Sequence, residues 1–287
     1  MFKQGIRIIL TASILMGPMI NDCEARSDVW RDIAKIFSTV NNSSSSSSRQ
    51  QTDPAPQQIE FKLDGNYSRM QFSSDMFKKP SVVSEHYFTV DTPSEVDLHF
   101  IGHTNIEHYF YIFDSDQNSL GYYVYMREGV GDKTLMLKPG RYVIKTKVGG
   151  LYSDKMIDFE IKGKARNIPV TINVPNYSRH EAVGLFFGEE TVDYMPVYNK
   201  EEQKQKYYKI TLQQPTTINI LIDQLSKTCS VNFELLDVDE RNIDYLGSFN
   251  DNHIFYTKTL GAGTYYLKAK RSGATSENDG AFSIRIK

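Results

Sequence analysis

The chain has 287 residues, of which 40% are hydrophobic and 24% charged, and its formal net charge is −2 at pH 7. This length exceeds one average domain and leaves enough apolar residues for two domains with cores of their own. The slightly acidic balance argues against nucleic acid as a partner, because phosphate binding requires a basic surface.

Residues 1–25 have the pattern of a secretory signal peptide. Basic residues precede an apolar run from Ile8 to Ile20, and small residues around Ala25 indicate the cleavage point. The run is shorter than the roughly 20 apolar residues that span a membrane, and no later segment approaches that length. We therefore expect an exported mature chain, periplasmic or secreted, without a transmembrane segment. A lipoprotein anchored at Cys23 is the alternative.

Residues 26–40 have the apolar spacing of a short amphipathic helix, and residues 41–58, rich in Ser, Pro and Gln, are predicted to be a disordered linker. The helix could dock on another protein or anchor at an interface, with Trp30, Ile33 and Phe37 as candidate contact residues. It could also pack on its own domain. The long linker favours docking at a distance.

From Ile59 onward, short runs rich in Val, Ile, Tyr, Phe and Thr alternate with turn residues, a pattern typical of β-strands. Two sequence blocks each recur 123 residues later in the chain. Phe110–Asp116 matches Phe233–Asp239, and Leu137–Tyr142 matches Leu260–Tyr265. In the second block, glycine permits a sharp corner, and we expect the tyrosine to cover the edge of the core with its hydroxyl in water.

The repetition predicts an all-β fold of two tandem antiparallel β-sandwich domains, jelly-roll-like, at residues 59–164 and 165–287. Short strands at this spacing favour a sandwich over a barrel or a parallel sheet.

These blocks resemble the bacterial pre-peptidase C-terminal domain, a β-sandwich module found beside secreted proteases and in other exported proteins. The shared pattern is an apolar strand ending in Asp, followed by a leucine, a glycine corner and a G-x-Y strand. Both copies have it, as Leu137-Lys-Pro-Gly-Arg-Tyr142 and Leu260-Gly-Ala-Gly-Thr-Tyr265. The resemblance implies two copies of this module in an exported bacterial protein, here without a protease domain. Some members of that family bind calcium.

Asp114, Asp116 and Asn118 have the spacing that begins a calcium loop, and their oxygens suit a hard cation. However, Ser119 replaces the loop glycine, and Tyr125 stands where the bidentate glutamate should be. Aspartates that bond their own backbone in a turn explain the same residues. Calcium at this turn is the one candidate cofactor, and both explanations remain open.

The spacing of the other candidate residues does not fit a known metal site or catalytic motif. His180 begins like a zinc-protease helix, but Gly184 stands where the second histidine is required. His99, His103 and His108 are close in sequence, yet on a strand the first two would lie about 13 Å apart. No nucleophile elbow or phosphate-binding glycine loop is present. We predict no catalytic residues.

Tyr123 and Tyr125 fall on one face of a predicted strand, where their rings could stack on sugars or anchor a protein partner. The simpler explanation, which the sequence favours, is that these rings cover the core of the sandwich. We therefore expect a non-catalytic exported binding or accessory protein that recognises a protein or glycan at the cell envelope or outside the cell. The alternatives are a secreted hydrolase or its inhibitory subunit with a site built from distant residues, and a structural subunit of a surface assembly.

Overall fold

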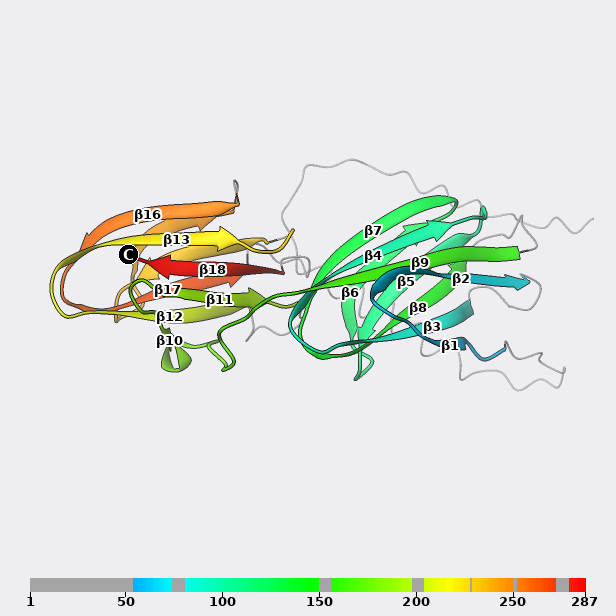
Figure 1. Cartoon of the computed structure of the whole chain (residues 1–287), viewed down its shortest axis with the longest axis horizontal. Helices are drawn as coiled ribbons and strands as arrows, with labels where there is room; N and C mark the ends of the chain where they lie inside the picture. Colours follow the sequence, from blue (N-terminus) through cyan, green and yellow to red (C-terminus); the bar gives the residue numbers. More distant parts are fainter. Residues whose placement is uncertain are drawn as a thin grey trace, which may run out of the picture. The chain divides into compact units, whose positions relative to one another are not determined.

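The computed structural model describes residues 54–73, 81–149, 156–197, 204–227, 229–249, 252–271 and 279–287 (Figure 1). All of them belong to one compact unit, Gln51–Lys287. The predicted signal peptide, the amphipathic helix with Trp30, Ile33 and Phe37, and most of the linker lie outside these residues. Among the described residues, none forms a helix with the length and apolar character to cross a membrane.

The first sandwich is built from β1 to β9 and has a five-stranded and a four-stranded sheet. The five-stranded sheet contains, in order, β1 (Gln57–Glu60), β3 (Ser81–Val90), β8 (Gly140–Gly149), β5 (Glu107–Asp114) and β6 (Ser119–Met126). The four-stranded sheet contains, in order, β2 (Asp64–Ser73), β9 (Met156–Asn167), β4 (Ser94–Gly102) and β7 (Gly129–Leu137).

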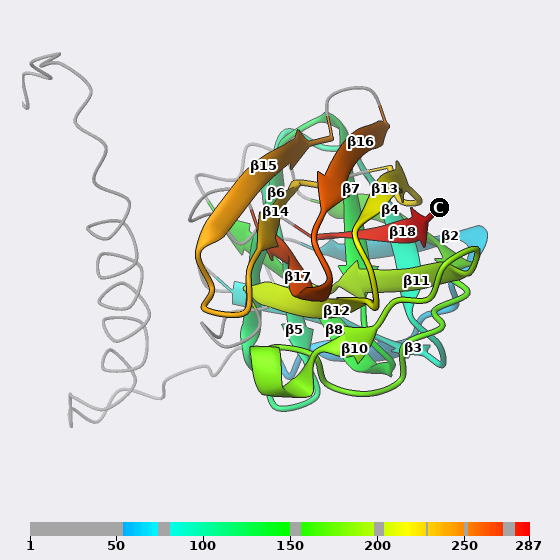
Figure 2. The same ribbon diagram turned by 90° about the vertical axis from the view of Figure 1, so that its left-hand side faces the viewer.

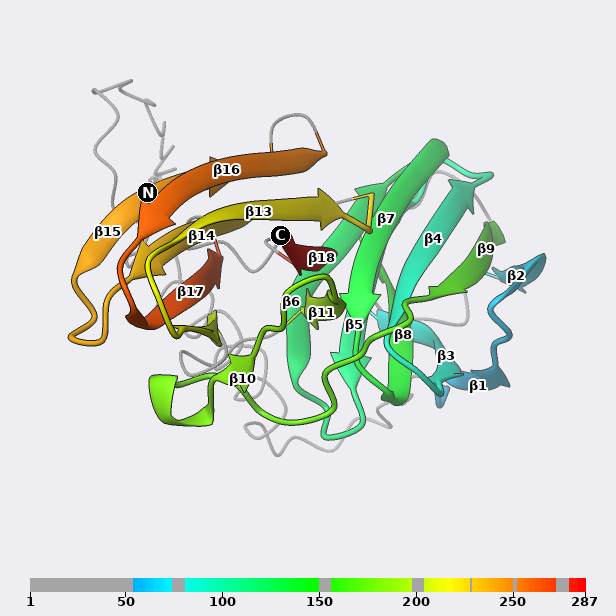
Figure 3. The ribbon, with the colours of Figure 1, turned by 60° about the vertical axis from the view of Figure 1, so that its left-hand side comes forward.

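The second sandwich, built from β10 to β18, repeats this plan strand for strand. Its five-stranded sheet contains β10 (Val183–Gly184), β12 (Gln205–Leu212), β17 (Gly263–Arg271), β14 (Val231–Leu236) and β15 (Asn242–Ser248). Its four-stranded sheet contains β11 (Glu190–Met195), β18 (Gly280–Ile286), β13 (Thr216–Gln224) and β16 (His253–Leu260), and Figure 3 shows β13 beside β16.

The prediction of an all-β protein with two sandwiches is confirmed. Between the named strands, the pairing is antiparallel except at one edge of each five-stranded sheet, where β1 pairs parallel to β3 and β10 pairs parallel to β12. Figure 2 shows β10 at that edge, next to the single 3-10 turn of the described residues, η3 (Arg179–Glu181). The domain boundaries at residues 59–164 and 165–287 stay predictions.

Strand alternation builds a separate core in each sandwich. On β4, Val96, Leu98 and Phe100 point inward and are at most 1% exposed, as their spacing predicts. They pack with Phe110 and Phe159 in the first core. The second core contains the large aromatic residues Tyr208, Phe233 and Phe282, together with aliphatic residues such as Ile220, Ile222 and Leu267.

The recurring glycine and tyrosine block forms the same corner twice. Gly140 and Gly263 have φ angles of 159° and 152°, in the region that favours glycine. Two residues later the Tyr142 hydroxyl donates to the Lys138 carbonyl at 2.8 Å, and the Tyr265 hydroxyl donates to the Gly261 carbonyl at 3.1 Å. The expectation of a hydrated tyrosine hydroxyl is therefore wrong for Tyr142, which is buried and closes the turn that precedes its own strand.

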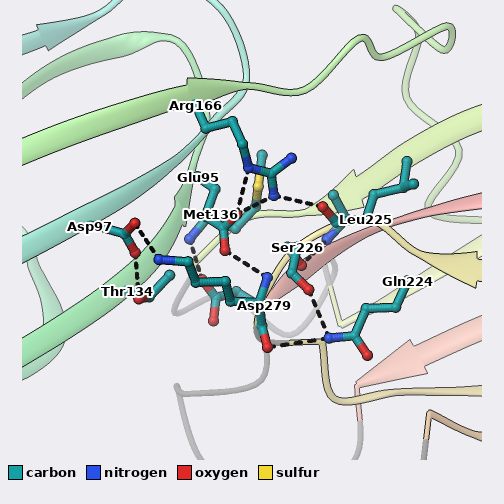
Figure 4. A network of polar contacts seen from close by, with 11 residues as sticks. Glu95, Asp97, Thr134, Met136, Arg166, Gln224, Leu225, Ser226 and Asp279 are labelled. Atoms are coloured by element: carbon teal, nitrogen blue, oxygen red, sulfur yellow. Dashed lines mark hydrogen bonds and ion pairs between the residues drawn. The ribbon is translucent and has the colours of Figure 1, made fainter. Parts of the chain in front are cut away.

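Polar contacts join the two sandwiches (Figure 4). Glu95 of β4 accepts the backbone N–H of Lys227 at 2.6 Å, and the Lys227 ammonium donates to Asp97 at 2.5 Å. In the other direction, the Met136 N–H of β7 donates to Asp279. An apolar cluster lies alongside, made of Met136, Ile168, Val192 and Ala281.

Candidate binding face

Four tyrosines gather on the outer surface of the five-stranded sheet of the first sandwich. On β5 the buried Phe110 and Ile112 alternate with Tyr109 and Tyr111, whose side chains therefore point outward. On β6 Tyr125 lies directly opposite Tyr109, and Tyr123 lies directly opposite Tyr111. We call these four residues the tyrosine face: Tyr109, Tyr111, Tyr123 and Tyr125.

The four rings are arranged by their contacts with one another. The centroids of Tyr109 and Tyr125 are 5.0 Å apart, and those of Tyr111 and Tyr123 are 5.8 Å apart in a stacked pair. Tyr109 and Tyr111 stack along β5 at 6.3 Å. Tyr123 and Tyr125 are nevertheless 49% and 47% exposed. The rings are therefore ordered in advance and still offer apolar surface to a ligand.

A charged pair lies at one end of the tyrosine face. The Glu107 carboxylate accepts from the Arg127 guanidinium at 2.8 Å, and from the hydroxyls of Tyr109 and Tyr125 at 3.2 and 3.4 Å. The Arg127 guanidinium is the main cause of a lowered pKa at Glu107. The carboxylate is therefore charged at neutral pH and holds two of the four phenol groups in place.

The structure resolves one question that the sequence left open. Tyr123 and Tyr125 were candidates either for ligand contact or for core covering, and they lie on the solvent side of the sheet. Their role in binding stays a prediction. Sequence reasoning missed Tyr109, Tyr111 and Glu107, although three aromatic residues at every second position from 109 to 113 are visible in the sequence.

The second sandwich provides an internal comparison for this surface. Lys145 and Lys147 of β8 lie opposite Tyr111 and Tyr109 on the neighbouring strand. In the second sandwich Lys268 and Lys270 of β17 occupy the same two register positions. The two sheets can therefore be compared residue by residue.

Most of the tyrosines are not repeated in the second sandwich. Opposite Lys268 and Lys270, β14 carries Glu234 and Asn232 in place of Tyr111 and Tyr109. The cross-strand partners of these two residues on β15 are Tyr245 and Ser248. One copy of the fold thus forms with a single tyrosine at these four positions, so the fold itself does not require the tyrosine face.

The candidate calcium turn is closed by its own hydrogen bonds. The Asp114 carboxylate accepts the backbone N–H groups of Asp116 and Asn118 at 3.0 and 2.8 Å, and the Asn118 side-chain amide at 3.1 Å. Asp237 accepts the corresponding N–H groups in the second sandwich. These contacts fit the turn explanation, and calcium at Asp114, Asp116 and Asn118 stays a prediction.

The three neighbouring histidines do not converge. His99 pairs with Asp132 at 2.5 Å, and His103 lies 3.1 Å from Glu160. His108 points into the core of the sandwich. Within the ranges that the structure describes, no group of three or more His, Cys, Asp or Glu side chains is placed to hold a metal ion.

A buried polar cluster in the second sandwich was not foreseen from the sequence. The Asp193 carboxylate accepts from the Lys206 ammonium at 2.5 Å, the Tyr208 hydroxyl at 2.8 Å and the Asn176 amide at 3.2 Å. Burial is the main cause of a lowered pKa at Lys206, which Asp193 partly offsets. These side chains come from three separate segments and are almost fully enclosed, which suits a structural role better than contact with a substrate.

No protein-family model matches the sequence, and no curated protein sequence matches it. Among solved structures, the pre-peptidase C-terminal domain of a collagenase from Bacillus anthracis is 18% identical, with a TM-score of 0.32, and the match covers 40% of this chain and 100% of that one. Tripeptidyl peptidase 2 is 9% identical, with a TM-score of 0.29, over 81% of this chain and 24% of that one.

The tandem CBM22 domains of Xyn10C from Paenibacillus barcinonensis are 8% identical, with a TM-score of 0.23, over 78% of this chain and 95% of that one. All three TM-scores lie well below 0.5, so these similarities carry no argument about this chain. The resemblance to the pre-peptidase C-terminal family therefore still rests on the sequence blocks.

Proposed function

We propose that this protein is an exported, non-catalytic binding protein whose first sandwich recognises a glycan through the tyrosine face. The observation that carries the proposal is the comparison between the two sandwiches. They share strand order and the flanking lysines, yet at the positions of the four tyrosines the second sandwich has a single tyrosine, Tyr245. A feature that one copy of the fold lacks is best explained by function.

The chemistry of the surface favours a glycan over a protein partner. A pyranose ring offers C–H bonds to the negative face of an aromatic ring, and its hydroxyls need nearby donors and acceptors. Glu107 and Arg127 supply such groups beside Tyr125. The large exposed apolar residues on these two strands are tyrosines, whose flat rings suit stacking against a sugar ring.

Export to the periplasm or beyond and a pre-peptidase-like ancestry of both sandwiches are parts of the same proposal. They are supported by the signal pattern at residues 1–25 and by the repeated blocks. Calcium at Asp114 and Asp116 would be an accessory feature, since their turn closes β5 at the end remote from Glu107.

The test is retention of the purified protein on insoluble cellulose, chitin and peptidoglycan at pH 7. We expect at least one polysaccharide to retain the protein, and the double variant Tyr123→Ala, Tyr125→Ala to bind about ten- to thirtyfold more weakly, from about 1 kcal/mol for each lost aromatic contact. Tyr245→Ala is the matched control, because Tyr245 is 52% exposed and lies at the corresponding place in the second sandwich.

Binding that is unchanged in the double variant, or weakened equally by Tyr245→Ala, would contradict the proposal. So would the absence of retention on all three polysaccharides. If instead the tyrosine face captures a protein from envelope extracts, and the double variant loses it, the partner is a protein and the glycan assignment is wrong.

A further inference from the structure

Two histidines lie in the core of the first sandwich, on the inner side of the five-stranded sheet whose outer side carries the tyrosine face. His86 is on β3 and His108 is on β5, and both side chains are fully buried. Both rings pack against Phe159, with centroid distances of 6.3 and 5.5 Å. His108 lies between Glu107 and Tyr109 in the chain, on the strand that carries two of the four residues of the tyrosine face.

The two imidazoles lack the partners that a charged ring would need. His86 has one polar contact, 3.1 Å from its Nε2 to the Ser84 hydroxyl, and its Nδ1 has none. Neither nitrogen of His108 makes a hydrogen bond of normal geometry. Thr146, which lies on β8 between these strands, also has a buried hydroxyl without a partner. A proton added here would place a charge among apolar side chains.

The groups around the two imidazole rings also disfavour a positive charge on them. Phe61 and Phe159 face His86, and Phe110 and Phe159 face His108. Among the described residues, the one charged group shown to act on either ring is Asp158 of β9. Asp158 and the backbone carbonyl of Ile106 both favour the protonated form of His108, but their effect is smaller than that of burial. Asp158 is itself engaged by the Arg69 guanidinium at 2.7 Å.

Burial lowers the pKa of both His86 and His108 from the usual 6.5 to about 4. In an opened sandwich the same rings would take up protons near pH 6.5. Between pH 6.5 and 4 the open form therefore binds more protons than the closed form, and acid shifts the balance toward opening. Each histidine can change the open-to-closed ratio by about two orders of magnitude across this window.

The second sandwich lacks this feature. The residue in the register position of His86 is Tyr208, whose hydroxyl donates to Asp193 at 2.8 Å, and the residue in the position of His108 is Val231. A tyrosine with a fixed partner and a valine do not take up protons between pH 7 and 4. The two sandwiches should therefore respond differently to acid.

We propose that the first sandwich is an acid-sensitive module, in which protonation of His86 and His108 opens β3 and β5 and disperses the tyrosine face, so that bound glycan is released at low pH. This inference rests on the proposed function for its last step only. The opening itself concerns the fold and can be measured without any ligand.

The first experiment measures amide hydrogen exchange of the full chain at pH 7.0 and 4.5, corrected for intrinsic exchange rates. We expect protection in β3 and β5 to fall at least tenfold more than in their counterparts β12 and β14. His108→Val, which installs the residue of the second sandwich, should remove a large part of this difference, and the exposed His253→Val should leave it unchanged. Equal loss in both sandwiches would overturn the proposal.

If His108→Val does not fold, the wild-type comparison of β3 and β5 with β12 and β14 still decides the question. The second experiment measures release of the protein from the polysaccharides named above when the pH is lowered from 7.0 to 4.5. Retention at pH 7 with no release at pH 4.5 would refute the switch while leaving the glycan assignment intact. Acid opening in the exchange experiment without any polysaccharide binding would refute the glycan assignment alone.

Discussion

Asp193 lies fully buried in the second sandwich and accepts four hydrogen bonds, from Lys206, Tyr208, Asn176 and the backbone N–H of Tyr194. The sequence contained no signal for this cluster, because the three side chains that donate to Asp193 are between 13 and 17 residues from it and follow no motif. Patterns of local spacing detect strands and turns. They do not detect which distant polar side chains share one enclosed space.

Removing this carboxylate should be costly. We expect Asp193→Ala to lower the free energy of unfolding by about 3–5 kcal/mol, because the enclosed Lys206 ammonium would lose its counter-charge. Asp239→Ala is a suitable control, since that carboxylate is exposed and pairs with Arg241 at 3.6 Å, and we expect a change within about 0.5 kcal/mol. Urea unfolding followed by circular dichroism measures both. Similar effects from the two variants would show that the cluster does not support the fold.

Strands and corners are the elements that the sequence predicts best. The alternation in Glu95–Ile101 predicts an inward face of Val96, Leu98 and Phe100, and the structure has it. The repeated blocks predict two domains of the same fold, and the two sandwiches have the same strand order. The parallel strands β1 and β10 were missed, because four and two residues are too short to show a period.

The hydrogen bond from the tyrosine hydroxyl at each glycine and tyrosine corner can be tested by removing that hydroxyl. Tyr142→Phe removes the hydroxyl that donates to Lys138 and leaves the ring, so we expect a loss of about 1 kcal/mol in the free energy of unfolding. Tyr265→Phe removes the equivalent bond in the second sandwich, where the hydroxyl is more exposed and the bond is longer, and should cost less. Urea unfolding of the two variants measures both losses in the free energy of unfolding. A larger effect for Tyr265→Phe would show that the corner is not stabilised in this way.

Across the whole molecule, Asp279 joins the two sandwiches and is 2% exposed. Burial raises its pKa to about 6, even though the Met136 N–H and the charges of Arg271 and Lys133 oppose the shift. The neutral form is therefore favoured by folding. The stability that it contributes is complete below pH 3.8 and is lost as the pH rises through 6, which is opposite in sign to the effect of the buried histidines.

We expect Asp279→Asn to remove this pH dependence. At pH 7.5 the variant should be more stable than the wild type by up to about 3 kcal/mol, because asparagine can accept the Met136 N–H without a buried charge. At pH 4 the two proteins should differ little. Thermal unfolding at both pH values measures the difference. A variant that is less stable than the wild type at pH 7.5 would show that the charge of Asp279 strengthens the contact.

The two parallel edge strands also bear on solubility. A long exposed edge strand offers unpaired backbone groups on which another chain can add a strand, and very short edge strands limit that risk. β1 and β10 cover the sides of β3 and β12 with four and two residues. Each five-stranded sheet therefore ends, on this side, in a strand too brief to template aggregation, a safeguard that the chain carries twice.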